Sequence, residues 1–198
     1  MVTDNLRTPL LILASPRTGS TALGQYFLKQ FPTATYFPEP DWIKHDPSVM
    51  GKFINNIQSK DYDFIVKILY YCMKWYSDDI RNFLLSPATS KIRLRRRDTV
   101  SQMASLYVAM YRNWTYHYLD KSALDIKEII PVKDDQNMDW VVNEILVANK
   151  QMDESNLKFD LDLYYEDLPA LDETGFNKTP LPLNYEDIKL AFAKKLNR

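Results

Sequence analysis

Cysteine and histidine are nearly absent from this sequence of 198 residues, which contains one cysteine and two histidines. The single cysteine, Cys72, excludes a disulfide framework and a cysteine-rich zinc site. It lies in an apolar run, so we expect a buried and unreactive thiol. His45 and His117 are too few to form a histidine-based metal centre without carboxylates. The chain is long enough to bury a full core without such covalent or metal links.

Long apolar runs are missing as well. No stretch approaches the roughly 18 consecutive apolar residues that a membrane-spanning helix needs. The residues from Met1 to Asn5 lack the basic start and the long apolar core of a signal peptide. We therefore expect a cytoplasmic protein without a membrane span.

A strong net charge is the third feature that this chain lacks. Its formal net charge is −1, which argues against a nucleic-acid-binding protein or a polybasic membrane protein. The charge is unevenly distributed, however: the first 119 residues carry a net charge of +6 and the remainder carries −7. The first part is therefore expected to hold the binding site for an anion, with no contribution from the acidic remainder.

Short apolar runs alternate with amphipathic segments along the chain. Strands are predicted at residues 9–14, 64–71, 91–97 and 158–164. Helices are predicted at residues 20–31, 49–58, 99–119, 138–152 and 185–196, with a further helix ending near residue 85. The proline-rich residues 33–47 are predicted to be a loop. This alternation predicts a single α/β domain over residues 1–198, a three-layer sandwich with a mainly parallel central sheet flanked by helices.

The loop after the first predicted strand is the first candidate binding element. It has the sequence SPRTGST, from Ser15 to Thr21, and it leads into a predicted helix. Ligands of open α/β sheets bind beyond the carboxyl ends of strands, and a helix N-terminus there offers free amides to an anion. Gly19 allows close approach of the backbone, and Arg17 adds a guanidinium. A simple Ser/Thr-capped turn is the alternative.

The second candidate element is the run of arginines at Arg93, Arg95, Arg96 and Arg97. On a strand, Arg93, Arg95 and Arg97 point to one face and Arg96 to the other. Asp98 or Thr99 can cap the helix that follows. Arg97 and Ser105, eight residues apart, could then bind a second phosphate. A solvated edge strand or a nucleic-acid-binding stripe are the alternatives, and Asp160 and Asp162 are interpreted as the solvated face of their own strand.

Together these two elements resemble the nucleotide-binding motifs of sulfotransferases that use 3′-phosphoadenosine 5′-phosphosulfate (PAPS). The resemblance is closest to the bacterial carbohydrate-type branch and rests on SPRTGST and on RRRDTVSQMAS. Two further segments agree with it, the Glu-Pro element at 37–40 and the YEDL segment at 165–168. The four matches follow the family's order and cover most of the chain. The resemblance implies a P-loop NTPase-like fold and a single sulfotransferase domain.

The resemblance also implies roles for individual residues. In the first loop, the 5′-phosphosulfate of PAPS would be bound by Arg17, Thr18, Gly19, Ser20 and Thr21. Arg97 and Ser105 would bind the 3′-phosphate, and the acceptor would be the hydroxyl of a small carbohydrate, lipid or metabolite. Glu39 would be the general base, with His45 as the alternative. No metal is expected, because the sulfuryl group carries less charge than a γ-phosphate.

The chain departs from this family in its last part. It is short for the family, and the basic or glycine-rich loop that closes over the nucleotide is not visible, although Lys178 is a candidate substitute. Lys67, on the second predicted strand, either faces the site or extends to solvent. A small-molecule kinase is a second hypothesis, against which the missing GK[ST] of a Walker A motif argues. A nucleotide-binding protein without catalysis is the third.

Overall fold

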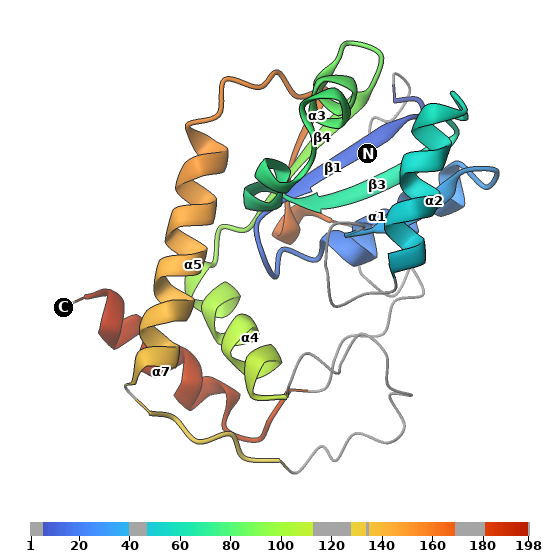
Figure 1. The fold of residues 1–198 in the computed structure, drawn as a ribbon. Helices are drawn as coiled ribbons and strands as arrows, with labels where there is room; N and C mark the ends of the chain where they lie inside the picture. The colour runs from blue at the N-terminus through green and yellow to red at the C-terminus, as the bar shows by residue number, and fades with distance from the viewer. Residues whose placement is uncertain (1–5, 40–46, 113–127, 134, 169–180, 198) are drawn as a thin grey trace.

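The computed structural model describes residues 6–39, 47–112, 128–133, 135–168 and 181–197 of the chain. Within these residues five strands form one sheet in the order β2-β3-β1-β4-β5, and all four strand pairs are parallel. The predicted α/β fold with a parallel central sheet is therefore confirmed (Figure 1). The strands are β1 (Leu10–Ala14), β2 (Thr35–Pro38), β3 (Phe64–Leu69), β4 (Ser90–Arg95) and β5 (Leu161–Tyr164).

The central strands are buried because both of their faces are apolar. Every residue of β1 and β3 is buried, which is typical of strands covered by helices on both sides. Leu10 of β1 is in register with Ile65 of β3 and with Ser90 of β4. The carboxyl ends of β1, β3 and β4 therefore lie side by side at one edge of the sheet.

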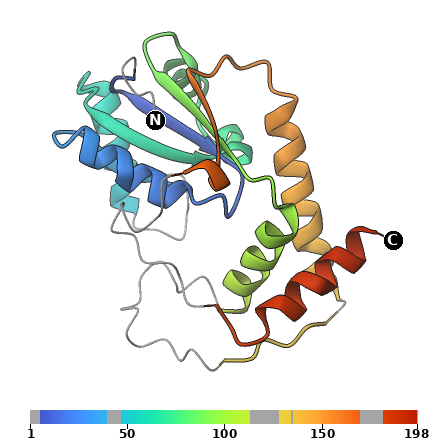
Figure 2. The same ribbon diagram turned by 180° about the vertical axis from the view of Figure 1, so that it is seen from behind.

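Helices cover both faces of this sheet. On one face α1 (Ser20–Gln30) packs its buried Leu23 and Phe27 against β1 and β4. On the other face lie α2 (Pro47–Gln58), the 3₁₀ helix η1 (Tyr70–Trp75) and α3 (Asp78–Leu85). The views from the two sides show α1 and α2 on opposite faces, which gives the three layers of the sandwich (Figures 1 and 2).

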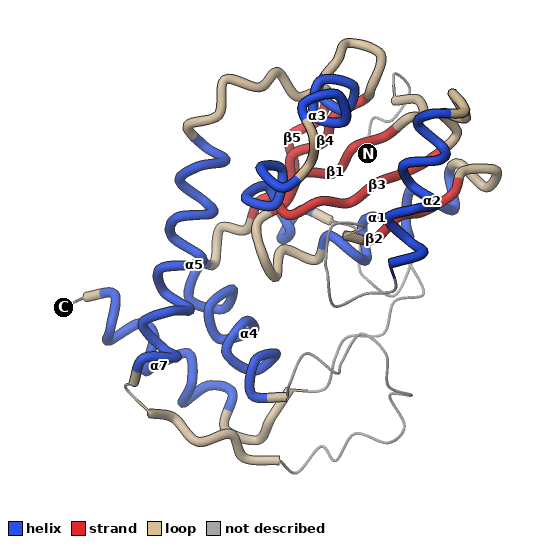
Figure 3. Tube along the Cα trace, viewed as in Figure 1, coloured by secondary structure: helices blue, strands red, loops and turns tan. Residues whose placement is uncertain are grey.

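A second group of helices lies beyond the carboxyl ends of the strands. It consists of α4 (Thr99–Tyr111), α5 (Gln136–Asp153) and α7 (Tyr185–Leu196), which pack around the buried side chains of Tyr107, Ile145 and Phe192. Figure 3 shows these helices below and beside the sheet. None of the described helices is long and apolar enough to cross a membrane.

Two of the predicted elements differ from the structure. The predicted loop at 33–47 contains β2, which pairs with β3 from Thr35 to Pro38. Only one neighbour orders this edge strand, so its pattern is weak, and Pro38 is tolerated at its end. The residues after β3 form a 3₁₀ helix and then α3, separated by Ser77, which caps α3 by accepting a hydrogen bond from the Ile80 amide. The predicted helix at 99–119 is described as far as Tyr111.

Gly24 in α1 and Gly51 in α2 provide a test of the packing. A Cβ on Gly24 would lie 2.6 Å from Cε2 of Tyr36, whereas a Cβ on Gly51 meets no heavy atom within 4 Å. We expect Gly24→Ala to lower the free energy of unfolding by about 1–3 kcal/mol, because the Tyr36 ring must move. Gly51→Ala should raise it by up to about 1 kcal/mol through helix propensity. Urea denaturation of both variants measures the difference.

The double variant Gly24→Ala/Tyr36→Leu tests whether the Tyr36 ring causes the destabilisation expected for Gly24→Ala. Shortening Tyr36 removes the ring atoms that the new methyl group meets, so the two changes should be strongly non-additive. Additive effects would show that the methyl group is not what destabilises the helix.

Candidate functional site

The loop between β1 and α1 forms a tight turn at the centre of the carboxyl edge of the sheet. Its backbone is unusual at two positions, since Arg17 has φ 61° and Gly19 has φ 76°. The Thr18 hydroxyl closes the turn by donating to the Ser15 carbonyl oxygen at 3.0 Å. Of the residues that the structure describes, none caps α1 with a side chain, because Gly19 occupies the N-cap position. The first amides of α1 are thus available to a ligand rather than to the predicted alternative of a Ser/Thr cap.

Gln102 of α4 holds this loop in place from the other side. Its Nε2 donates to Ser15 Oγ at 2.9 Å and to the Pro16 carbonyl oxygen at 2.6 Å. Its Oε1 accepts a hydrogen bond of 3.3 Å from Asn149 on α5. Gln102 is fully buried, so these hydrogen bonds are protected from water and fix α4 to the loop.

Arg17 is the guanidinium of the loop and reaches toward α4. Its Nε donates to Ser105 Oγ at 3.1 Å across 88 residues of sequence. Its two Nη groups make no hydrogen bond with any residue that the structure describes. Burial is the main effect on the pKa of Arg17 and lowers it, the charge of Glu39 opposes this, and the charge of Arg96 lowers it further. Arg17 therefore lies within electrostatic reach of both Glu39 and Arg96.

Glu39 and Lys67 form a buried ion pair beside this loop. Glu39 follows β2 with φ 48°, and its amide donates to the Lys67 carbonyl oxygen at 2.8 Å. Lys67 Nζ donates to Glu39 Oε1, and the two side chains are only 5% and 16% exposed. Of the two orientations considered for Lys67, the structure has the one in which the ammonium stays inside the protein rather than extending to solvent.

The arginines of β4 are stacked on aromatic rings rather than solvated. Arg93 lies 4.9 Å from the ring centroid of Phe159, and Arg95 lies 4.5 Å from that of Tyr164. β4 runs between β1 and β5, so the alternative of an edge strand is wrong. Each of these guanidiniums is attracted by the negative face of its ring, and the rings exclude water from one side of the row.

Acidic side chains from the last third of the chain neutralise this row. Asp162 accepts from both Arg93 and Arg95, and Asp153 accepts from Arg95 at 3.0 Å. Asp160 accepts from the Lys91 amide at 2.8 Å. Asp160 and Asp162 are exposed, as expected for the solvated face of their strand, but they also accept hydrogen bonds from β4. The acidic remainder of the chain, which was expected to make no contribution to the anion site, pairs with the arginines beside it.

The turn between β4 and α4 is organised by Glu166. Its carboxylate accepts from the amides of Arg97 and Asp98, each at 3.1 Å. Asp98 in turn caps α4 by accepting from the Ser101 amide at 2.8 Å, which confirms the predicted cap. Partial burial raises the pKa of Glu166, but the two donated amides and the charge of Arg96 outweigh it, so that the pKa is lowered overall.

Tyr165 joins the YEDL segment to the first loop. A Cβ added to Gly19 would lie 2.6 Å from Cδ2 of Tyr165, so the ring lies directly against the glycine. The guanidinium of Arg96 lies 4.7 Å from the centroid of the same ring. Two candidate motifs that are far apart in sequence, the loop and the YEDL segment, thus meet through one aromatic ring.

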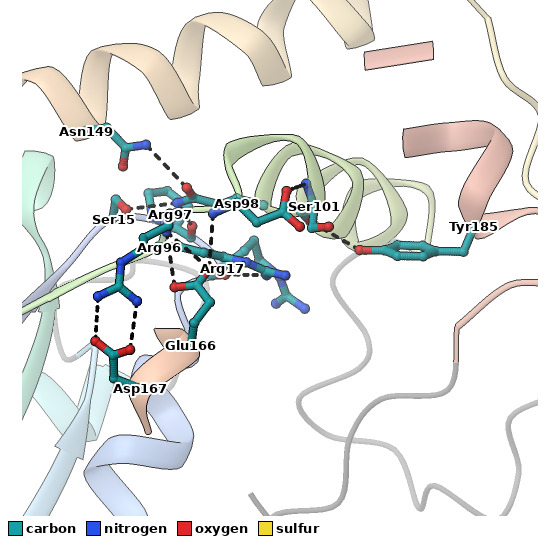
Figure 4. A network of polar contacts seen from close by, with 12 residues as sticks. Ser15, Arg17, Arg96, Arg97, Asp98, Ser101, Asn149, Glu166, Asp167 and Tyr185 are labelled. Atoms are coloured by element: carbon teal, nitrogen blue, oxygen red, sulfur yellow. Dashed lines mark hydrogen bonds and ion pairs between the residues drawn. The ribbon is translucent and has the colours of Figure 1, made fainter. Parts of the chain in front are cut away.

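The structure separates the two residues that were predicted to bind the 3′-phosphate together. Arg97 donates to both carboxylate oxygens of Asp167, at 2.7 and 2.6 Å (Figure 4). Ser105 instead accepts from Arg17. Figure 4 also shows the Arg97 guanidinium directed away from Ser101 and Tyr185. Ser20 and Thr21 begin α1, the other predicted loop residues precede it, and Thr18 and Ser20 are buried. Glu39 follows β2. His45 and Lys178 lie outside the described residues.

Sequence reasoning did not identify Gln102, Tyr165 or Asp167 as parts of this site. A signal was present for Gln102, because it lies three residues before Ser105 and thus on the same face of α4. Tyr165 and Asp167 belong to a motif that the sequence analysis recognised. Their contacts depend on the pairing of β4 with β5, which no local pattern reveals.

No protein-family model matches this chain, and no curated protein or solved structure matches it either. Within the described part of the chain, no group of three or more histidine, cysteine, aspartate or glutamate side chains could hold a metal ion. The case for a function therefore comes from the motifs of the chain and the geometry in which they meet.

The Glu39–Lys67 pair leads to a prediction about stability. Lys67→Met should lower the free energy of unfolding by about 3 kcal/mol, because it leaves the carboxylate of Glu39 largely buried without its cation. Lys67→Met/Glu39→Gln removes both charges and should recover most of this loss. Chemical denaturation of the single and double variants measures the coupling, and purely additive losses would contradict the ion pair.

Glu166 leads to a prediction about pH dependence. Its folded-state pKa is lowered, so its contribution is complete above the unfolded value of about 4.3 and is lost as the pH falls through the folded value. Glu166→Gln should destabilise the protein by about 1 kcal/mol at pH 7, and this difference should disappear on acidification. Glu154→Gln is the control, because Glu154 is exposed and its one ion pair within the described residues is with Lys150 at 3.8 Å. A Glu166→Gln effect that is independent of pH would refute the role of the carboxylate charge.

Proposed function

We propose that this protein is a PAPS-dependent sulfotransferase, which transfers a sulfuryl group from PAPS to a hydroxyl of a small acceptor. The observation that carries the proposal is the hydrogen bond from Arg17 Nε to Ser105 Oγ. It joins the SPRTGST loop to the RRRDTVSQMAS segment, the two elements on which the resemblance to sulfotransferases rests. Two motifs that were separately chosen as anion-binding elements therefore share one place at the carboxyl edge of the sheet.

The β1–α1 loop supports binding of the phosphosulfate group. It offers the uncapped amides of α1, the positive end of that helix and the two Nη groups of Arg17. Gly19, with its left-handed backbone, turns the chain into the helix at this point. These donors are held before a ligand arrives, since Gln102 and Thr18 fix the loop, and donors fixed in this way stabilise charge without reorganisation.

The Glu39–Lys67 pair supports proton removal from the acceptor. Lys67 bonds to Oε1 of Glu39, and the Oε2 atom has no hydrogen-bond partner among the described residues. The acceptor hydroxyl attacks the sulfur atom, the bond between sulfur and the bridging phosphate oxygen breaks, and Glu39 takes the proton. 3′-Phosphoadenosine 5′-phosphate (PAP) leaves, and its new charge lies next to Arg17 and the amides of α1.

Nucleotide binding provides the first test. PAP should raise the melting temperature of the protein, because a ligand that binds the folded state stabilises it. ATP with Mg²⁺ should have little effect. Arg17→Ala should weaken PAP binding about tenfold or more, since it removes charge-assisted hydrogen bonds. If instead ATP–Mg²⁺ stabilises the protein and PAP does not, the kinase hypothesis replaces this proposal.

Turnover provides the second test. Pools of small hydroxyl compounds are incubated with protein and PAPS and searched by mass spectrometry for products that gain one sulfate. Glu39→Gln should abolish this gain while PAP affinity stays within about threefold, because the base acts on the acceptor and not on the nucleotide. Glu154→Gln serves as the active control. A wild-type protein that binds PAP but sulfates no compound in any pool would indicate a binding protein.

A further inference from the structure

Two adjacent arginines, Arg96 and Arg97, point in different directions. The side chain of Arg96 is 15% exposed, and its Nη1 donates to the carbonyl oxygen of Arg17 at 3.3 Å. The side chain of Arg97 is 52% exposed and bonds to Asp167 with both of its Nη groups. The strand alternation of β4 continues into the turn, so that Arg96 faces the loop and Arg97 faces away from it.

Arg97 has a carboxylate within hydrogen-bonding distance, whereas Arg96 has only a longer ion pair in the described part of the chain. Asp167 forms a paired, two-hydrogen-bond contact with Arg97, the strongest geometry available to a guanidinium. The nearest acid to Arg96 is Glu166, whose Oε1 lies 4.0 Å from Nε and already accepts two backbone amides. The Nε of Arg96 is buried and has no hydrogen-bond partner among the residues that the structure describes.

Arg17 and Arg96 therefore form a pair of like charges, and neither has a carboxylate within hydrogen-bonding distance in the described part of the chain. Arg96 Nη1 donates to the Arg17 carbonyl oxygen at 3.3 Å, which brings the two arginines together. In agreement with this, burial lowers the pKa of Arg17, Glu39 acts against this, and Arg96 lowers it further. The Nη groups of Arg17 have no partner in the described part of the chain. A bound oxyanion would bridge the two cations, remove their repulsion and accept from donors that are otherwise unused.

We propose that Arg96, and not its neighbour Arg97, is the second guanidinium of an oxyanion site that it forms with Arg17 and Ser105. The ligand chemistry is a tetrahedral dianion, such as a phosphate monoester. The identification of that ligand as a phosphate of PAPS rests on the proposed function, whereas the oxyanion site itself does not. Arg97 has a structural role, because it ties the turn after β4 to Asp167 and stacks on Tyr164 at 4.0 Å.

The neighbouring arginines provide matched variants for the test. Arg96→Gln and Arg97→Gln each remove one charge and keep a polar side chain. In calorimetric titration, Arg96→Gln should lower the affinity for PAP by about tenfold or more, and Arg97→Gln should change that affinity by no more than about threefold. Arg96→Lys, which restores the charge, should recover part of the affinity. The opposite order, with Arg97→Gln the weaker binder, would overturn the proposal.

If Arg96→Gln does not fold, Asp167→Asn provides a separate test of whether Arg97 binds the phosphate. This variant releases Arg97 from its carboxylate partner without changing Arg96. If Arg97 were the ligand of the phosphate, its release would change PAP affinity by tenfold or more. Our proposal expects a change within about threefold.

Further ligands separate this inference from the proposed function. AMP lacks the 3′-phosphate and therefore shows which phosphate Arg96 binds. If Arg96→Gln lowers the affinity for PAP and for AMP equally, Arg96 binds the 5′-phosphate. If it lowers the affinity for PAP alone, Arg96 binds the 3′-phosphate. If PAP does not bind to the wild type, the proposed function fails, and inorganic phosphate then tests the site. Phosphate binding that requires Arg96 upholds the oxyanion site, and phosphate binding that does not require it, or no phosphate binding at all, overturns it.

Discussion

The arginines at the end of β4 and in the turn that follows must be neutralised before the sheet and the site can form. Arg93 and Arg95 lie in the sheet, Arg96 and Arg97 follow it, and such closely spaced charges need rings and carboxylates as partners. The segment from Asp153 to Asp167 supplies both, through Phe159, Tyr164 and the three aspartates that pair with the row. This requirement places β5 beside β4 and brings the end of α5 to the same row, because Arg93 and Arg95 reach Met152 and Asp153.

The same requirement positions the candidate site. Once β5 pairs with β4, the YEDL segment follows at the carboxyl edge of the sheet. There Glu166 fixes the turn into α4, Tyr165 covers Gly19, and Asp167 holds Arg97. The fixed turn directs α4 so that Gln102 and Ser105 meet the first loop. The pairing of the arginines with the YEDL segment and its neighbours thus determines which hydrogen-bond donors at the carboxyl edge of the sheet, the Nη groups of Arg17 and the Nε of Arg96, have no partner in the described part of the chain.

Two kinds of buried charge then coexist at the carboxyl edge. Glu39 and Lys67 satisfy each other and need no ligand to be stable. Arg17 and Arg96 are like charges in contact through the Arg17 carbonyl oxygen, and they have no carboxylate within hydrogen-bonding distance in the described part of the chain. In the proposed reaction the first pair meets the acceptor and the second meets the donor nucleotide. A site with one balanced pair and one unbalanced cationic pair is suited to an anionic co-substrate that arrives, reacts and leaves.

Local sequence patterns predict the parallel sheet, the tight loop after β1 and the cap of α4, because apolar runs, turn residues and capping residues act over a few neighbouring positions. The edge strand β2 was not predicted, because its extended conformation depends on hydrogen bonding to β3 and not on a local pattern. Tertiary packing, in contrast, determines which of the two adjacent arginines, Arg96 or Arg97, faces the loop and which faces Asp167. The partners of those arginines lie about 70 to 80 residues away, and side-chain pairing over such separations depends on how the strands and helices pack, not on the local pattern of residues.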